Sequence, residues 1–246
     1  MDYENFTTFD LPIVYKELSF IPVSMKDYFP FMYFSQVLTI EKDDIPDPKV
    51  ISMKYLEYLF YAAKSDNDIL PMLDAILRIT TRKTDSIMQY SKDSRGKYVL
   101  VIDGSKYDSN DFEEIRKIIC IQNDLQLPDT TMQKKIRERL ADYERLLRKK
   151  NGSDKPSSIE DLVIALTISS SLTLKDIYEM PIRKFFRAIK RVDAKLHYQI
   201  MMTAKTSGFV KFRDDSAIKH WLSSLDVENR GFMSMEEAER KMNPTK

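Results

Sequence analysis

Apolar residues recur every three or four positions through much of the chain, and this spacing places them on one face of an α-helix. The pattern predicts helices at residues 49–64, 68–81, 109–123, 158–169, 174–179 and 181–206, with short helices at 216–225 and 236–242. The helix at 181–206 is the longest, and its apolar stripe is unbroken. That stripe consists of Ile182, Phe185, Ile189, Val192, Leu196, Ile200 and Ala204.

Particular residues mark where three of these helices begin. Ser157 with Glu160, and Thr173 with Asp176, have the spacing of a capping box, in which each side chain bonds a free backbone amide. Pro181 stands at the start of the long helix, where the amide that proline lacks would have no helical partner.

A small amount of β-structure is predicted before the helix at 109–123. Residues 86–107 contain the β-prone run Tyr98–Ile102, followed by the turn sequence Asp103-Gly104. This segment predicts a hairpin or a small sheet.

The first 45 residues are rich in aromatic residues, and Pro12 and Pro22 confine any strand there to a sheet edge or a strand end. Within this region, after Pro22, lie Phe29, Phe31, Tyr33 and Phe34, which we call the aromatic cluster. Core packing is the favoured interpretation, and a surface that contacts a partner is the alternative.

The best candidate for a domain boundary lies near residue 150. Residues 130–150 mix both charge signs around a narrow apolar seam, and Asn151–Ser157 has the composition of a linker. We therefore predict a mixed α/β domain at 1–150, which ends in the charged helix, and a helical domain at 151–246. The predicted fold class is α+β, predominantly α-helical, with a small β element in the N-terminal part.

Composition excludes several kinds of chemistry. One cysteine, Cys120, and two histidines, His197 and His220, cannot build a disulfide framework or a cysteine-based zinc site. The five glycines stand alone, so the dinucleotide-binding and P-loop motifs are missing. Cys120 lies in an apolar run typical of a buried thiol, and both histidines are interpreted as core contacts. We predict no catalytic residue, cofactor, metal or enzymatic activity.

Residues 226–237 have the outline of an EF-hand calcium loop, with Asp226, Gly231 and Glu237 at the first, sixth and twelfth positions. Arg230, however, places a cation at the fifth position, where an oxygen ligand belongs. We interpret the segment as a helix–turn–helix.

Charge is balanced over the whole chain, with 39 basic and 38 acidic residues and a net charge of +1. This balance gives no overall attraction to nucleic acid or to a membrane surface. The longest apolar stretch is too short to cross a bilayer, and the first residues lack the basic region of a secretory signal. We expect a cytoplasmic protein.

The helix at 181–206 nevertheless has a basic face opposite much of its apolar stripe. Its residues are Arg183, Lys184, Arg187, Lys190 and Arg191. Such a face is commonly solvated or paired with an acidic protein partner. The alternative is a nucleic-acid-binding protein that uses the helix at 183–195 to contact phosphates.

Several segments follow one another in a particular order: Phe112–Asn123, a charged helix, Ser157–Leu162, Leu172–Phe185, Val192–Ile200, Thr206–Phe212 and His220–Leu222. This series, at roughly residues 110–225, resembles baseplate-hub and tail-assembly proteins of large tailed bacteriophages. Its motifs are structural and not chemical, and the first 100 residues match only in their layout.

The resemblance implies a non-enzymatic structural or assembly protein that binds other tail and baseplate proteins. Such a protein is either a subunit kept in the virion tail or a chaperone in the host cytoplasm, and self-association is compatible with both. The resemblance brings no catalytic residues. We expect partner contacts at the basic face and at the aromatic cluster.

Overall fold

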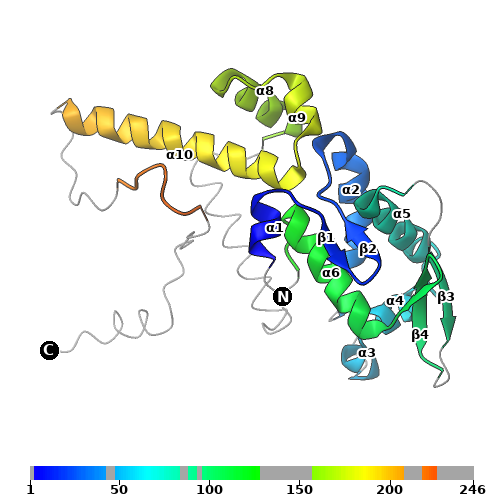
Figure 1. Ribbon diagram of the computed structural model, residues 1–246. Coiled ribbons are helices and arrows are strands. Elements are labelled where there is room, and N and C mark those ends of the chain that lie inside the picture. The colour runs from blue at the N-terminus through cyan, green and yellow to red at the C-terminus, as the bar shows by residue number, and fades with distance from the viewer. Residues whose placement is uncertain are drawn as a thin grey trace, which may run out of the picture. The chain divides into compact units, whose positions relative to one another are not determined.

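The computed structural model describes residues 3–42, 48–83, 88–92, 96–127, 157–207 and 218–225. The chain divides into two compact units, Met1–Phe186 and Arg187–Lys246. The N-terminal elements are α1 (Glu4–Thr8), β1 (Ile13–Tyr15), β2 (Leu18–Phe20), the 3-10 helices η1 (Met25–Asp27) and η2 (Ser35–Leu38), α2 (Tyr28–Phe34), α3 (Pro48–Ser52), α4 (Tyr55–Ala62) and α5 (Ile69–Thr81). They are followed by β3 (Met88–Lys92), β4 (Tyr98–Ile102), β5 (Ser105–Tyr107), α6 (Ser109–Asn123), α8 (Ile159–Ser169), α9 (Leu174–Glu179) and α10 (Ile182–Thr206) (Figure 1). The fold is α+β and predominantly helical, which confirms the predicted class.

The described strands form two small antiparallel sheets. In the β1–β2 hairpin Ile13 pairs with Phe20; β1 begins directly after Pro12, and β2 ends before Pro22. The sheet β3–β4–β5 confirms the β-structure predicted at 86–107 and adds a third strand. Asp103 and Gly104 link β4 to β5 with φ of 51° and 82°, the left-handed conformation that a two-residue hairpin turn requires.

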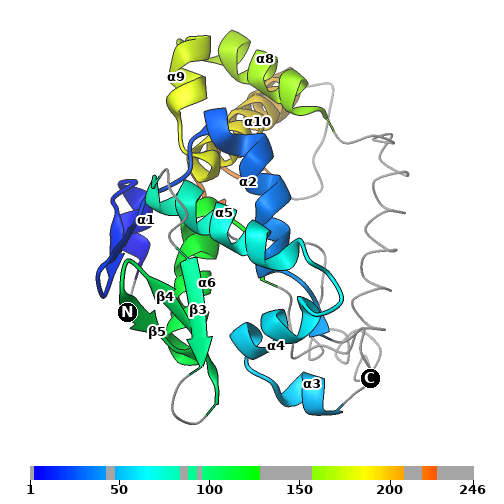
Figure 2. The same cartoon turned by 90° about the vertical axis from the view of Figure 1, so that its right-hand side faces the viewer.

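The core of the first unit is built around α6, which contacts α4 and β5. Its buried face consists of Phe112, Ile115, Ile118 and Ile119. The ring of Tyr55 on α4 stacks on Phe112 with centroids 6.4 Å apart, and the Arg116 guanidinium lies 3.5 Å from the Tyr55 ring centroid. On the next layer α5 contacts α2, α4 and β2 (Figure 2).

Most of the predicted helices are confirmed, because α5, α6, α8, α9 and α10 lie within a residue of their predicted bounds. The cap of α9 also agrees, since the Thr173 side chain accepts from the Asp176 amide. The cap of α8 is one residue later than predicted, with Ser158 and Asp161 in place of Ser157 and Glu160. Both pairs, Ser157 with Glu160 and Ser158 with Asp161, have the spacing of a capping box, so the sequence allows either register.

The single helix predicted at 49–64 is wrong, because α3 and α4 are separated at Met53 and Lys54. The Tyr55 amide donates to Glu113 Oε1 at 3.1 Å, and the Met53 carbonyl accepts from Lys42 Nζ. These distant side chains take up backbone groups that a continuous helix would bond internally, so the helix breaks here.

The helix predicted at 216–225 is also wrong for residues 218–225, which form turns. The Ser223 amide bonds the His220 carbonyl at 2.9 Å, and the His220 ring accepts from the Leu222 amide at 3.2 Å. Arg191 on α10 takes the carbonyls of Trp221 and Ser223. Backbone oxygens used in this way are not available to a helical ladder.

Several predictions fall outside the described residues. They are the charged helix at 130–150, the linker up to residue 156 with the boundary at 150, the EF-hand-like segment at 226–237 and the helix at 236–242. The domain division at 1–150 and 151–246 therefore stays a prediction.

Candidate interaction surfaces

A short backbone pairing fixes where α10 begins. The Ile182 amide donates to the Val23 carbonyl at 2.8 Å, and the Met25 amide donates to the Met180 carbonyl at 2.8 Å. The Val23 amide in turn donates to Asn123 Oδ1 at the end of α6, at 2.9 Å. The first turn of α10 is thereby attached to the core, where Ile182 and Phe185 are buried.

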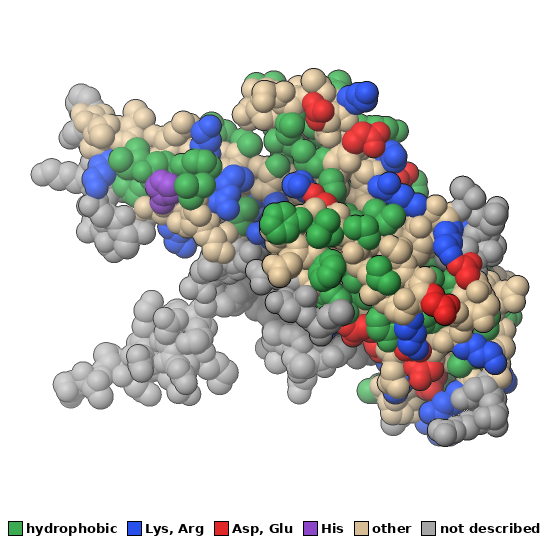
Figure 3. Space-filling model, viewed as in Figure 1, with side chains coloured by type: hydrophobic (Ala, Val, Ile, Leu, Met, Phe, Trp, Pro, Cys, Tyr) green, Lys and Arg blue, Asp and Glu red, His purple; other side chains and the backbone are tan. Residues whose placement is uncertain are grey.

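Beyond that first turn the apolar stripe of α10 is open. Ile189 and Val192 are only half-buried, while Leu196 and Ile200 are 49% and 67% exposed. Figure 3 shows hydrophobic side chains on the surface of α10 in this region. The interpretation of His197 and His220 as core contacts is wrong, because both are exposed. The His220 ring instead lies 5.0 Å from the ring of Tyr198.

The basic face of α10 is partly engaged by the chain itself. Lys184 Nζ forms an ion pair with Asp10, and Arg191 donates to the carbonyls of Trp221 and Ser223. Of the other three residues of this face, Lys190 is exposed, and Arg183 and Arg187 are half-buried. The structure therefore gives Lys184 and Arg191, both predicted contact residues, an internal role.

The aromatic cluster is divided between core and surface, because it forms α2. Phe31 is fully buried and Phe34 half-buried, whereas Phe29 and Tyr33 are 71% and 57% exposed. Phe29, Met32 and Tyr33 follow the i, i+3, i+4 spacing and so lie on one open face of the helix. Core packing and surface exposure, the two interpretations of the sequence, each apply to part of the cluster.

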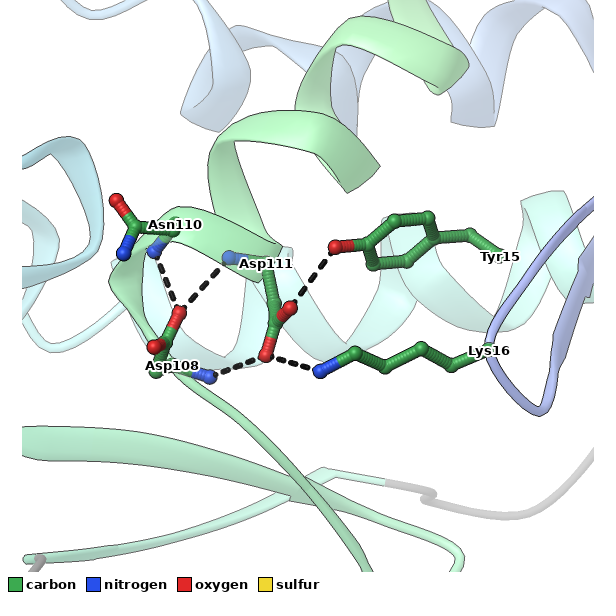
Figure 4. Close-up of polar contacts among 5 residues, drawn as sticks. All are labelled: Tyr15, Lys16, Asp108, Asn110 and Asp111. Atoms are coloured by element: carbon green, nitrogen blue, oxygen red, sulfur yellow. Dashed lines mark hydrogen bonds and ion pairs between the residues drawn. The ribbon is translucent and has the colours of Figure 1, made fainter. Parts of the chain in front are cut away.

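A polar cluster at the start of α6 was not found by sequence reasoning (Figure 4). Asp111 accepts from the Tyr15 hydroxyl at 2.8 Å, from Lys16 Nζ at 2.6 Å and from the Asp108 amide at 3.0 Å. Asp108 caps the helix by accepting from the amides of Asn110 and Asp111. The spacing of Asp108 and Asp111, which is that of a capping box, is the pattern from which the cap was predictable.

This cluster attaches the β1–β2 hairpin to α6 and leaves no free base. Burial by itself raises the pKa of Asp111, but the hydrogen bonds from Lys16, the Asp108 amide and Tyr15 outweigh it and lower the pKa below its ordinary value. Burial and the bond to Asp111 raise the pKa of Tyr15 to about 12. Asp111 is therefore a charged acceptor that three donors already engage, which is a structural role.

A hollow of about 310 Å³ lies between α4 and the turn before β4. It is lined by Met53, Glu57, Tyr61, Lys64, Gly96, Lys97 and Tyr98. Glu57, Lys64 and Lys97 give it a mixed apolar and charged lining, and none of the predicted contact residues belongs to it.

Few groups in the described part of the chain suit other chemistry. Among those residues, no three His, Cys, Asp or Glu side chains gather closely enough to hold a metal ion. Burial raises the pKa of the Cys120 thiol to about 11, so the thiol is not an activated nucleophile. None of the described helices is long and apolar enough to cross a membrane.

Comparison with known proteins adds a finding about the C-terminal part. Neither the curated proteins nor the solved structures contain a match to the chain. Residues 149–226, about a third of the 246-residue chain, match the family model of the YomV second domain. YomV is a Bacillus phage-region protein. The segment that contains α8, α9 and α10 is thus similar to a phage-associated domain, and the match carries nothing specific to a baseplate hub.

Proposed function

We propose that this chain is a non-enzymatic structural or assembly protein of a phage tail, acting at the baseplate hub by binding other tail proteins. One observation carries the proposal: the segment similar to a phage-associated domain leaves many large apolar side chains in contact with solvent. The exposed ones are Ile164, Ile168, Leu174, Tyr178, Leu196, Ile200 and Leu222. The buried apolar ones are Leu166, Ile177, Ile182 and Phe185.

Single exposed apolar side chains are ordinary, but among the described residues of this segment the exposed large ones outnumber the fully buried ones, and exposed apolar patches mark interaction surfaces. A segment of this kind is stabilised when another protein covers it, which is the expected state of a subunit within a larger assembly. The open face of α2, formed by Phe29, Met32 and Tyr33, supports the same role in the N-terminal part. In this proposal the protein works by stoichiometric binding, either as a subunit that is kept in the tail or as a chaperone that acts in the host cytoplasm.

Nucleic-acid binding by residues 183–195 has weaker support. Lys184 and Arg191 are committed to Asp10 and to the carbonyls of Trp221 and Ser223. Each such contact competes with a phosphate for the same side chain, and the near-neutral net charge adds no general attraction.

Quantitative mass spectrometry of purified particles, and of the lysate that produced them, tests the proposal. A fixed copy number per particle indicates a structural subunit, whereas abundance in the lysate together with absence from particles indicates a chaperone. Deletion of the coding sequence should reduce the yield of particles with complete tails in either case. Unchanged tails after deletion would refute the proposal.

The same deletion gives a test of the aromatic cluster by complementation. Phe29→Ser and Tyr33→Ser change exposed residues, so the chain should fold normally but restore tail assembly poorly. Tyr90→Ser, another exposed aromatic position, is the matched control and should restore assembly fully.

A further inference from the structure

In the second unit, α10 has an apolar face that residues 218–225, the described segment beside it, do not cover. Between Arg187 and Thr206 this face consists of Ile189, Val192, Leu196 and Ile200. These residues follow the 3- and 4-residue spacing and span about 17 Å along the helix axis. Exposure increases along them, from half-buried at Ile189 to 67% exposed at Ile200.

The chain covers the opposite side of the same helix. Residues 218–225 contact α10 through Arg191, which donates to the Trp221 and Ser223 carbonyls, and through Tyr198, whose ring meets that of His220. Arg191 and Tyr198 are seven residues, or about two turns, apart and so share a face. Ile200 lies nine residues after Arg191, about two and a half turns, and so on the opposite side of the helix. Of the described residues of this unit, the turn segment at 218–225 therefore lies on the basic side of α10 and does not cover the apolar side.

Charge defines what can occupy the open side. Within α10 the basic residues are Arg183, Lys184, Arg187, Lys190, Arg191, Lys195 and Lys205, and the one acidic residue is Asp193. Lys190 and Lys195 are exposed and lie on either side of the apolar face. An occupant with apolar residues at its centre and acids along both edges would match this arrangement.

We propose that the apolar face of α10, at Ile189, Val192, Leu196 and Ile200, is the docking site for an acidic amphipathic helix of a partner protein. The proposal rests on the proposed function in that both invoke a protein partner, but it names a different surface from the basic face that the sequence predicted. The apolar residues supply the contact area, and Lys190 and Lys195 select the acidic partner.

Two other occupants fit the same face less well. A second copy of the chain would place one strongly basic helix against another, which like-charge repulsion disfavours. An anionic membrane surface would meet Asp193, which lies seven residues before Ile200 and so on the same side. A partner helix can keep its acids opposite Lys190 and Lys195 and away from Asp193, whereas a uniformly anionic surface cannot.

A designed peptide tests the proposal on the full chain without knowledge of the natural partner. The probe is a three-heptad helical peptide with leucines at its a and d positions and glutamates along both edges. The matched peptide carries lysines in place of the glutamates. Gln199→Cys, an exposed position beside the apolar face, provides a fluorescent labelling site, because Cys120 is buried and its raised pKa keeps it unreactive.

The acidic peptide should bind, and its affinity should fall as salt is raised, whereas the lysine peptide should not bind. Leu196→Ser and Ile200→Ser should each weaken binding by about tenfold or more, since each removes a buried branched side chain from the contact. Ile168→Ser on α8 is the control, because Ile168 is 80% exposed and lies on another helix. Circular dichroism confirms that each variant keeps its helices.

Three results would overturn the proposal. The first is equal binding of both peptides, or of neither. The second is flotation of the chain with phosphatidylserine vesicles that Leu196→Ser abolishes, which would assign the face to a membrane. The third is a dimer in sedimentation that Ile200→Ser dissociates, which would assign it to a second copy. The particle measurement above is independent of all three, so either proposal can fail while the other stands.

Discussion

Removal of the Asn123 side chain should destabilise the attachment of α10 to the core. Asn123 is 2% exposed, and its Oδ1 accepts from the Val23 amide at 2.9 Å while its Nδ2 donates to the Ile119 carbonyl at 2.9 Å. The Val23 carbonyl accepts from the Ile182 amide, so Val23 connects the end of α6 to the start of α10 through its two backbone groups. In Asn123→Ala the Val23 amide stays buried without its acceptor.

The cost follows from these two bonds. A buried amide left without a partner costs about 1–3 kcal/mol, and loss of the second bond adds about 1 kcal/mol. We therefore expect Asn123→Ala to lower the free energy of unfolding by about 2–4 kcal/mol. Gln199→Ala, at an exposed position on α10, should change it by less than about 0.5 kcal/mol.

Urea unfolding followed by far-ultraviolet circular dichroism measures this difference. Circular dichroism is preferred because the single tryptophan, Trp221, belongs to the second unit and would not report on Asn123. A loss in Asn123→Ala no larger than that in Gln199→Ala would refute the reasoning, since the Val23 amide would then have an alternative acceptor.

Three further predictions follow from burial and charge. Phe31→Ala should cost about 3–5 kcal/mol of unfolding free energy, whereas Phe29→Ser on the same helix should cost less than about 0.5 kcal/mol; similar losses would contradict the division of the aromatic cluster. Asp111→Asn should cost about 1–2 kcal/mol at neutral pH. Because the pKa of Asp111 is lowered in the folded chain, its contribution is present above the ordinary aspartate pKa and is lost as the pH falls through the lowered value, so urea titrations of the two proteins should converge in acid. A thiol reagent at mildly alkaline pH should modify Cys120 at least about 100-fold more slowly in the folded than in the urea-unfolded chain, and comparable rates would show that the thiol is accessible.

Local features of the chain were predictable from the sequence because they depend on neighbouring residues. The periodicity of α5, α6 and α10 is a property of the helix itself, and the bounds agree within a residue. The Asp103-Gly104 turn and the Thr173 cap also follow from local chemistry. The resemblance of the second half to phage proteins agrees at the level of a phage-associated domain, and its baseplate role stays a proposal.

Contacts between distant residues decided what the sequence left open. Glu113 and Lys42 break the helix at Met53, which periodicity alone would continue. From the sequence, the aromatic cluster fitted both core packing and a surface that contacts a partner. Only the packing of α2 decided that Phe31 is buried and Phe29 is exposed.

The stripe on α10 shows the same limit most clearly. Hydrophobic spacing identifies an apolar face, but it does not say whether the chain itself contains a surface to cover that face. The tertiary structure buries Ile182 and Phe185, leaves Leu196 and Ile200 open, and covers the basic side through Arg191. The sequence by itself thus determined which face of the helix is apolar, and the tertiary structure decided which part of that face is buried and which part is exposed, because burial depends on residues far away in the chain.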